Sequence, residues 1–212
     1  SETFNLSENT SQGDLTDLII KLNSDPNFHG ILVQLPLPEH IDEERIVSSV
    51  NPNKDVDCMH PTNVGALCQG SYEFIPATPG GIQQLLLRNG YDPEGKHVVV
   101  CGRSNIVGKP LALLLMQKHK GANATVTVCH TGTRDLSEVT LTADILVAAI
   151  GRPRAIKVDM VREGTVVVDV GINRVHDPDN PRGYHLEGDV DYEAILAVDA
   201  FTALKTDAHL AF

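Results

Sequence analysis

The chain has 212 residues, enough for one large domain or two modest ones. Its 28 acidic and 17 basic residues give a net charge of −11, which argues against a nucleic-acid partner because such a partner requires a basic face. No segment approaches the roughly 20 apolar residues of a membrane span, and the polar start shows no signal peptide. We therefore expect a cytoplasmic protein that binds neither nucleic acid nor membrane.

The cysteines and histidines show none of the spacings typical of metal sites or disulfide frameworks. Cys58, Cys68, Cys101 and Cys129 form no C-x-x-C pair, and the nine histidines are scattered along the chain. We therefore predict reduced cysteines and no metal site.

The first third of the chain predicts helices around one short strand. Residues 15–23 and 41–50 have apolar side chains at helical spacing, and Gly30 to Gln34 form a short apolar run typical of a strand. The following Leu35-Pro-Leu-Pro38 ends the strand and keeps the backbone extended. Gln34 then stands at a strand exit, where it can face a cleft.

A turn rich in carboxylates follows at residues 51–57. Lys54, Asp55 and Asp57 fit an ordinary surface turn, and they also fit a substrate site in a domain beside a nucleotide-binding fold. At Pro76 to Gly80, Thr78 is a candidate N-cap and Pro79 a first helical residue. This pattern predicts a helix that runs to residue 89 and a domain boundary near residue 77.

The stretch from Lys96 to Met116 predicts a strand, a tight turn and a helix. An apolar run ends at Cys101, the turn Gly102-Arg-Ser-Asn-Ile-Val-Gly108 follows, and an apolar helical run begins at Pro110. Backbone amides at such a helix N-terminus favour anions, and a dinucleotide pyrophosphate is the usual ligand. Every strand–turn–helix unit needs a turn, however, so this pattern alone is also compatible with a purely structural role.

Further strand patterns at 124–129, 144–150 and 165–170 alternate with helical or loop segments. Continuous apolar strands in such an alternation predict an α/β fold with a Rossmann-type, doubly wound parallel sheet. Ligands bind beyond the carboxyl ends of its strands. The residues at these ends are Gly102, His130, Thr131, Gly151, Gly171 and Ile172.

The end of the second strand bears on the choice of dinucleotide. An NAD site usually has an acidic residue there, bonded to the ribose 2′-hydroxyl. This chain has no carboxylate before Asp135, whereas Arg103 lies in the inferred phosphate turn. Arg134 follows the second strand and also fits an ordinary solvated loop residue. Guanidinium groups pair well with phosphate oxygens, so we favour NADP, with NAD as the alternative.

Seven segments, in this order, resemble the methylenetetrahydrofolate dehydrogenase/methenyltetrahydrofolate cyclohydrolase family. They are residues 30–38, Lys54–Asp57 with His60-Pro61, 76–79, 102–110, 124–130, Val168-Asp-Val-Gly-Ile-Asn173 and Gly188-Asp-Val-Asp191. Together they cover nearly the whole chain up to about Tyr192, and the ordered set is far more specific than any one of them.

The resemblance implies two activities of one-carbon metabolism. A hydride passes from the methylene carbon that bridges two nitrogens of tetrahydrofolate to the nicotinamide, and water then opens the methenyl cation to 10-formyltetrahydrofolate. It also implies a folate domain at 1–77 that lacks its N-terminal part, an NADP-binding domain at 78–188, and a site in the cleft between them. A segment or helix at 189–212 is expected to pack back on the first domain, and a homodimer is expected.

For the folate site, the resemblance implies that Asp57 hydrogen-bonds the pterin ring and that Leu35 and Pro36 line the pocket. Gln34 would contact the catalytic lysine and help to set its protonation. A carboxylate can accept two N–H bonds from a pterin edge, and a proton-carrying lysine needs a depressed pKa, which burial and a neutral partner provide.

For the cofactor site, the resemblance implies that Gly102, Arg103 and Ser104 hold the phosphates. Thr131 would lie near the 2′-phosphate and Ile172 beside the nicotinamide half. The remaining candidate cofactor residues are Val107, Gly108, His130, Gly151 and Gly171.

The chain departs from the family pattern at both ends. No tyrosine has a lysine four residues later, and the family's Tyr-x-x-x-Lys motif would lie upstream of Ser1. The family's Pro/Gly-rich loop is also missing after Gly188-Asp-Val, where residues 197–212 predict an amphipathic helix (Ile195, Val198, Phe201, Leu204). Either the chain is part of a longer enzyme, or it is a remnant that binds nucleotide with little catalysis. A shikimate-dehydrogenase-like enzyme is a third possibility, against which Gln34 and Asp57 argue.

Overall fold

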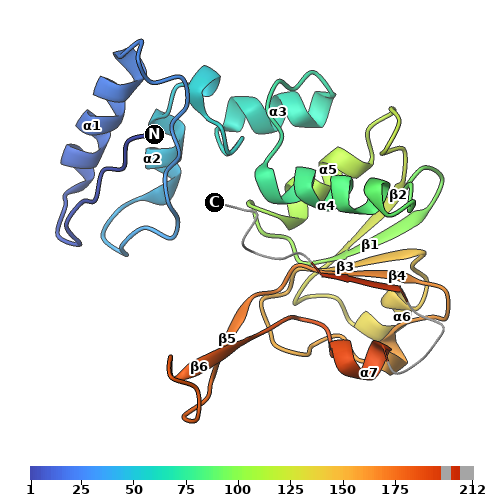
Figure 1. Ribbon diagram of the computed structural model, residues 1–212. Helices are drawn as coiled ribbons and strands as arrows, with labels where there is room; N and C mark the ends of the chain where they lie inside the picture. Colours follow the sequence, from blue (N-terminus) through green and yellow to red (C-terminus); the bar gives the residue numbers. More distant parts are fainter. Residues whose placement is uncertain (197–201, 206–212) are drawn as a thin grey trace. The chain divides into compact units, whose positions relative to one another are not determined.

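The computed structural model describes residues 1–196 and 202–205, and the chain divides into two compact units, Ser1–Pro76 and Ala77–Phe212 (Figure 1). The sequence predicted a boundary near residue 77, and the two units meet between Pro76 and Ala77. Among the described residues, no helix has the length and apolar character needed to cross a membrane.

The first unit consists of short helices around a small apolar core. They are α1 (Gln12–Ser24), α2 (Glu43–Ser49), η1 (Pro52–Lys54) and α3 (Pro61–Gln69). The Ser11 and Asp42 side chains cap α1 and α2 by accepting backbone N–H bonds from Asp14 and Arg45. The core contains Leu15, Ile19, Ile31, Ile41, Ile46 and Val50.

The strand predicted at 30–34 is reduced to a single parallel bridge between Ile31 and Asp55. The Ile31 N–H donates to the Lys54 carbonyl over 2.7 Å, and the two prolines that follow cannot donate to a longer ladder. Helix α3 was not predicted, although its ends carry clear signals. His60 caps its start, Pro61 is its first residue and Gly70 ends it in the left-handed conformation.

The second unit is a parallel sheet in the order β2-β1-β3-β4-β7, which confirms the predicted doubly wound fold. The strands are β1 (His97–Cys101), β2 (Thr125–Cys129), β3 (Ile145–Ala148), β4 (Val166–Asp169) and β7 (Thr202–Lys205). From β1 the chain first continues to β2 on one side and then returns to β3 on the other side, so the strand order reverses between β1 and β3. In such sheets this switch point is where ligands bind.

Helices cover both faces of the sheet. On one face lie α4 (Ala77–Arg88) and α5 (Gly108–Leu115); on the other lie α6 (Leu136–Thr140), η2 (Val158–Met160) and α7 (Tyr192–Leu196). Helix α4 therefore begins at residue 77, so Thr78 is not its N-cap.

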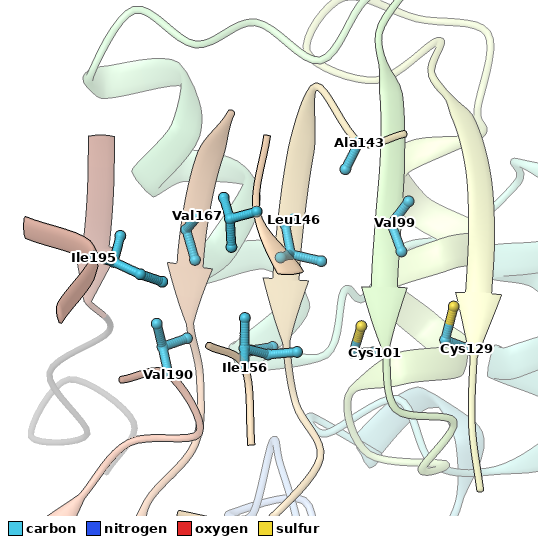
Figure 2. Packing of buried hydrophobic residues seen from close by; sticks show 11 residues of the cluster. Val99, Cys101, Cys129, Ala143, Leu146, Ile156, Val167, Val190 and Ile195 are labelled. Carbon is cyan, nitrogen blue, oxygen red and sulfur yellow. The ribbon is translucent and has the colours of Figure 1, made fainter. Parts of the chain in front are cut away.

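Successive side chains of β1 point to opposite faces of the sheet. Val98 and Val100 pack with α4 and α5, whereas Val99 and Cys101 belong to the core cluster on the other side of the sheet, at whose far end Ile195 of α7 lies (Figure 2). Fully burying such a side chain contributes about 1.5–3 kcal/mol. Burial on both faces explains why the strands are continuously apolar rather than alternating.

The C-terminal region differs from the prediction. Val190 and Ile195 lie in the core of the second unit, not on the first domain. Residues 202–205 form β7 and pair with β4, so the predicted helix is wrong there. A strand satisfies the open backbone edge of β4, which a helix cannot do. The rest of the predicted helix, at 197–201 and 206–212, lies outside the described residues.

A short antiparallel hairpin connects β4 to α7. Its strands are β5 (Asn173–His176) and β6 (Tyr184–Glu187), and the guanidinium of Arg174 lies 5.0 Å from the centre of the Tyr184 ring. The sequence predictions did not include this hairpin.

Candidate functional site

The turn after β1 is built so tightly that only glycine fits at its two ends. Gly102 has φ +137°, and a Cβ there would collide with the carbonyl oxygen of Ala149. A Cβ at Gly108 would collide with the Gly102 carbonyl. The Gly102 N–H also donates to the Cys129 carbonyl over 2.9 Å, which ties this turn to the end of β2.

The same turn presents free backbone donors at the start of α5. The Ser104 hydroxyl accepts from the N–H groups of Val107 and Gly108 at 3.1 and 3.4 Å, so this side chain satisfies the first two amides at the start of the helix. In the described part of the chain, the N–H groups of Arg103, Ser104 and Asn105 have no protein acceptor. Free amides and the positive end of a helix dipole suit a pyrophosphate.

The turn after β2 is closed by its own side chains. The His130 N–H donates to the Thr133 hydroxyl at 2.9 Å, and the His130 ring accepts from the Gly132 N–H at 3.0 Å. Thr131 is exposed at the tip. The next carboxylate, Asp135, caps α6 through the Glu138 N–H, so this aspartate already has a structural task.

The turn after β3 is organised by a side chain that sequence reasoning missed. The fully buried Asp189 carboxylate accepts from the N–H groups of Ile150, Gly151 and Arg152 and from the Asn173 side-chain amide. The bonds from Gly151, Arg152 and Asn173 are each 2.9 Å long. The backbone at Gly151 turns through φ +74°.

Asp169, at the end of β4, holds the segment that carries Asp189. Its carboxylate accepts from the N–H groups of Gly171, Asp189 and Val190 at 3.0, 2.9 and 3.3 Å. Burial raises its pKa despite these bonds. A Cβ at Gly171 would collide with the Asp189 carboxylate, which explains this glycine. Ile172, the next residue, is exposed.

In the first unit, two aspartates that lie close together in the sequence have different surroundings. Asp55 is buried and accepts from the His60 N–H at 2.8 Å and the Asn63 amide at 2.9 Å. Asp57 is half-buried and accepts no hydrogen bond from the described residues. Burial, and secondly the Asp55 charge, raise the pKa of Asp57. Asp57 therefore has unused acceptor capacity.

Asp57 lines a small pocket with an apolar wall. The other lining residues are Ile31, Val33, Val47, Val50, Asp55 and Met59. Gln34, Leu35 and Pro36 follow Val33 directly but are not among the residues that line this pocket. The Gln34 amide donates to the Leu35 carbonyl at 3.2 Å, and the Leu35–Pro36 peptide is cis.

Lys54 proves to be structural. Its ammonium group donates to the carbonyls of Leu22 and Asp25 at 2.9 and 2.8 Å, at the C-terminal end of α1. A cation at this end of a helix is favourable. The predicted folate residues thus all belong to the first unit, and the predicted cofactor residues all belong to the second.

Comparison with known families matches each unit to one domain of the same enzyme family. Residues 1–57 match the model described as the tetrahydrofolate dehydrogenase/cyclohydrolase catalytic domain. Residues 76–204 match the model of that family's NAD(P)-binding domain.

Individual relatives agree. The bifunctional protein FolD of Syntrophus aciditrophicus is 58% identical, and the match covers 87% of this chain and 63% of that protein. The bifunctional protein FolD of Dehalococcoides mccartyi CBDB1 is 55% identical, and the match covers 92% of this chain and 66% of that protein. The chain thus spans slightly less than two thirds of these relatives.

Two solved structures are similar over almost the whole chain. The bifunctional FolD methylenetetrahydrofolate dehydrogenase/cyclohydrolase of Campylobacter jejuni has a TM-score of 0.86 at 44% identity, covering 97% of this chain and 69% of that one. The Trypanosoma brucei FolD, complexed with NADP cofactor and an inhibitor, has a TM-score of 0.83 at 37% identity and covers 93% and 65%.

Proposed function

This chain belongs to the tetrahydrofolate dehydrogenase/cyclohydrolase family, and on that premise we propose that the protein is a bifunctional, NADP-dependent enzyme. It would act as a 5,10-methylenetetrahydrofolate dehydrogenase and a 5,10-methenyltetrahydrofolate cyclohydrolase. The observation that carries the proposal is that both units match successive domains of this one family. We assign folate binding to the first unit and NADP binding to the second.

The second unit supports the cofactor assignment. Arg103, Ser104 and Asn105 offer free backbone amides beyond β1, which suit the pyrophosphate. The exposed Arg103 side chain and the Thr131 hydroxyl are the groups we assign to the 2′-phosphate. Asp135 is occupied by capping α6, which favours NADP over NAD because the usual ribose acceptor is absent. When bound, the cofactor supplies the hydride acceptor.

The first unit supports the folate assignment. Asp57 has an unused carboxylate beside apolar side chains, and a carboxylate of this kind can accept two N–H bonds from a pterin edge. Asp55 is held by two internal bonds and thereby keeps the backbone around Asp57 in place. Gln34 is proposed to contact the family's catalytic lysine, and Leu35 and Pro36 are proposed to line the folate pocket. We also propose a cytoplasmic homodimer, as the family resemblance implies.

The test is to supply the purified protein with NADP and 5,10-methylenetetrahydrofolate. We expect NADPH to form in the first step and 10-formyltetrahydrofolate to follow from the methenyl intermediate. Asp57→Ala should abolish folate-dependent NADPH formation and leave NADPH binding nearly intact. Tight NADPH binding without turnover of 5,10-methylenetetrahydrofolate or 5,10-methenyltetrahydrofolate would contradict the proposed activities and indicate a nucleotide-binding protein.

A further inference from the structure

The amides after β3 are already satisfied from inside the protein. Three consecutive N–H groups, of Ile150, Gly151 and Arg152, converge on the carboxylate of Asp189. Converging backbone amides of this kind commonly bind the anionic groups of ligands. Here the anion is the protein's own, so these donors are not available to the cofactor phosphates.

The Asp189 carboxylate also reaches the turn after β4. Its Oδ1 atom accepts from the Asn173 amide at 2.9 Å and lies against Gly171, which has no side chain to displace it. A single buried group therefore contacts the turns that follow two neighbouring strands of the sheet. Both turns lie at the carboxyl edge, where a dinucleotide binds in folds of this type.

The backbone of Asp189 is fixed independently of its side chain. Asp169 accepts the N–H groups of Asp189 and Val190, and Gly188 packs against the Asp169 carboxylate so closely that a Cβ would collide with it. The Asp189 carbonyl in turn accepts from the Ile156 N–H at 2.9 Å. The side chain thus extends from an anchored backbone and can hold the two turns in a fixed relation.

We propose that Asp189 is a positioning residue for the dinucleotide: its buried carboxylate shapes the turns at Gly151 and Gly171 so that the cofactor meets a preformed surface. This role rests on the proposed NADP binding. Asparagine keeps only one acceptor oxygen, so Asp189→Asn should leave some of these amides without their acceptor, loosen both turns and increase the ordering cost of binding.

Asp144, whose side chain is 41% exposed, offers a control at the opposite edge of the same sheet. Its carboxylate likewise joins two parts of the fold, accepting from the His97 N–H and the Arg162 guanidinium at 2.9 Å each. It lies at the amino ends of the strands, away from the dinucleotide edge. Asp144→Asn should therefore lower stability without changing NADPH affinity.

The experiment measures two properties of Asp189→Asn in the full chain: NADPH affinity by calorimetry and amide hydrogen exchange at residues 150–152. We expect affinity to fall at least about tenfold and these amides to exchange faster, while those of β1 keep their protection. Exchange is measured without NADPH, so it tests the positioning of the turns even if the wild-type protein fails to bind the nucleotide.

Three results would overturn the proposal: unchanged exchange at 150–152, unchanged NADPH affinity in folded Asp189→Asn, or an equal loss of affinity in Asp144→Asn. If Asp189→Asn does not fold, Asn173→Ala replaces it, because this variant removes one of the four donors and keeps the charge. It should weaken NADPH binding by about two- to fivefold. Unaltered affinity in this variant would equally contradict the proposed role of the hydrogen bonds to Asp189.

Discussion

At the scale of single residues, hydrogen-bond partners distinguish the carboxylate that we propose for folate binding from a structural one. Asp55 and Asp57 are two positions apart, yet Asp55 accepts two internal bonds and Asp57 accepts none from the described residues. A half-buried, unpartnered carboxylate has a raised pKa because burial disfavours its charge. The charged Asp57 carboxylate therefore lowers the stability of the fold, and a ligand that donates hydrogen bonds to it can offset this loss.

Replacing Asp57 by asparagine should therefore separate stability from binding. Because the folded-state pKa of Asp57 is raised, its stabilising contribution is present at acidic pH and is lost as the pH rises through that pKa. At neutral pH Asp57→Asn should raise the melting temperature. It should also weaken folate binding about 10- to 100-fold, because a hydrogen bond to a charged group contributes about 1.5–3 kcal/mol.

Thermal unfolding and titration with a folate analogue measure these two effects. Asp55→Asn is the matched control, since this change disturbs the bonds from His60 and Asn63 and should lower the melting temperature. Destabilisation by Asp57→Asn would show that the Asp57 carboxylate has a structural partner in solution.

The proposed binding of the 2′-phosphate depends mainly on the Arg103 side chain. Arg103→Ala should weaken NADP binding about tenfold or more and NAD binding much less, because only NADP carries the phosphate that a guanidinium pairs with. Calorimetry with both nucleotides gives the ratio. Arg182→Ala, an exposed arginine in the loop between β5 and β6, serves as the charge control. An unaltered preference in Arg103→Ala would remove this basis for NADP.

At the scale of elements, the turn between β1 and α5 depends on contact distances more than on conformational freedom. A Cβ at Gly108 would collide with the Gly102 carbonyl and lie 2.9 Å from the Arg103 nitrogen. Gly108→Ala should therefore destabilise the second unit by about 1–3 kcal/mol and weaken NADPH binding.

Gly81→Ala is the control for this prediction. Gly81 lies in α4 of the same unit, and a Cβ there would meet nothing within 4 Å. Its replacement by alanine should stabilise the helix by about 0.5–1 kcal/mol. Denaturant unfolding of both variants gives the two free energies, and a neutral or stabilising Gly108→Ala would show that the turn tolerates a side chain.

Local and non-local signals explain which elements could be predicted. The strands β1 to β4 and the glycine turn were predictable because apolar runs and paired glycines lie close together in the sequence. Asp189 could not be recognised in this way, since its donors at 150–152 lie nearly 40 residues away. Strand β7 was mistaken for a helix because apolar spacing does not reveal that β4 offers an open edge.

The folate and cofactor assignments had a different source. The roles of Gln34, Asp57 and Ile172 were assigned through the family resemblance, and these roles stay predictions. The structure adds a physical distinction for one of them, because Asp57 has acceptor capacity that its neighbour Asp55 lacks.

The β5–β6 hairpin should respond to pH through His185. Hydrogen bonds to Glu187 and then Asp177, at 3.1 and 3.0 Å, raise the pKa of His185. The stabilisation is therefore complete below the unfolded-state pKa and is lost as the pH rises through the folded-state pKa. We expect faster amide exchange in the hairpin at about pH 8 than at about pH 6, after correction for intrinsic rates.

A nuclear magnetic resonance titration of the imidazole measures the shift directly. His185→Gln should remove the pH dependence of the hairpin, whereas the core strand β1 should respond equally in both proteins. A His185 pKa at or below the ordinary value would contradict the paired geometry.

At the scale of the whole molecule, the chain combines two units with different kinds of core. The second unit encloses a sheet between two apolar layers, whereas the first packs short helices around one small cluster. Each unit holds one set of proposed ligand contacts. Ligands should therefore stabilise the units selectively, because binding stabilises whichever structure contains the site.

Hydrogen exchange of the full chain with and without NADPH tests this selectivity. At about 100 times the dissociation constant, NADPH should add up to about 2.7 kcal/mol of protection to globally exchanging amides of the second unit, such as those of β1 and β3. Amides of α1 and α2 should gain much less. A folate analogue should protect the first unit instead. Equal protection of both units by NADPH would show that they open as one cooperative structure.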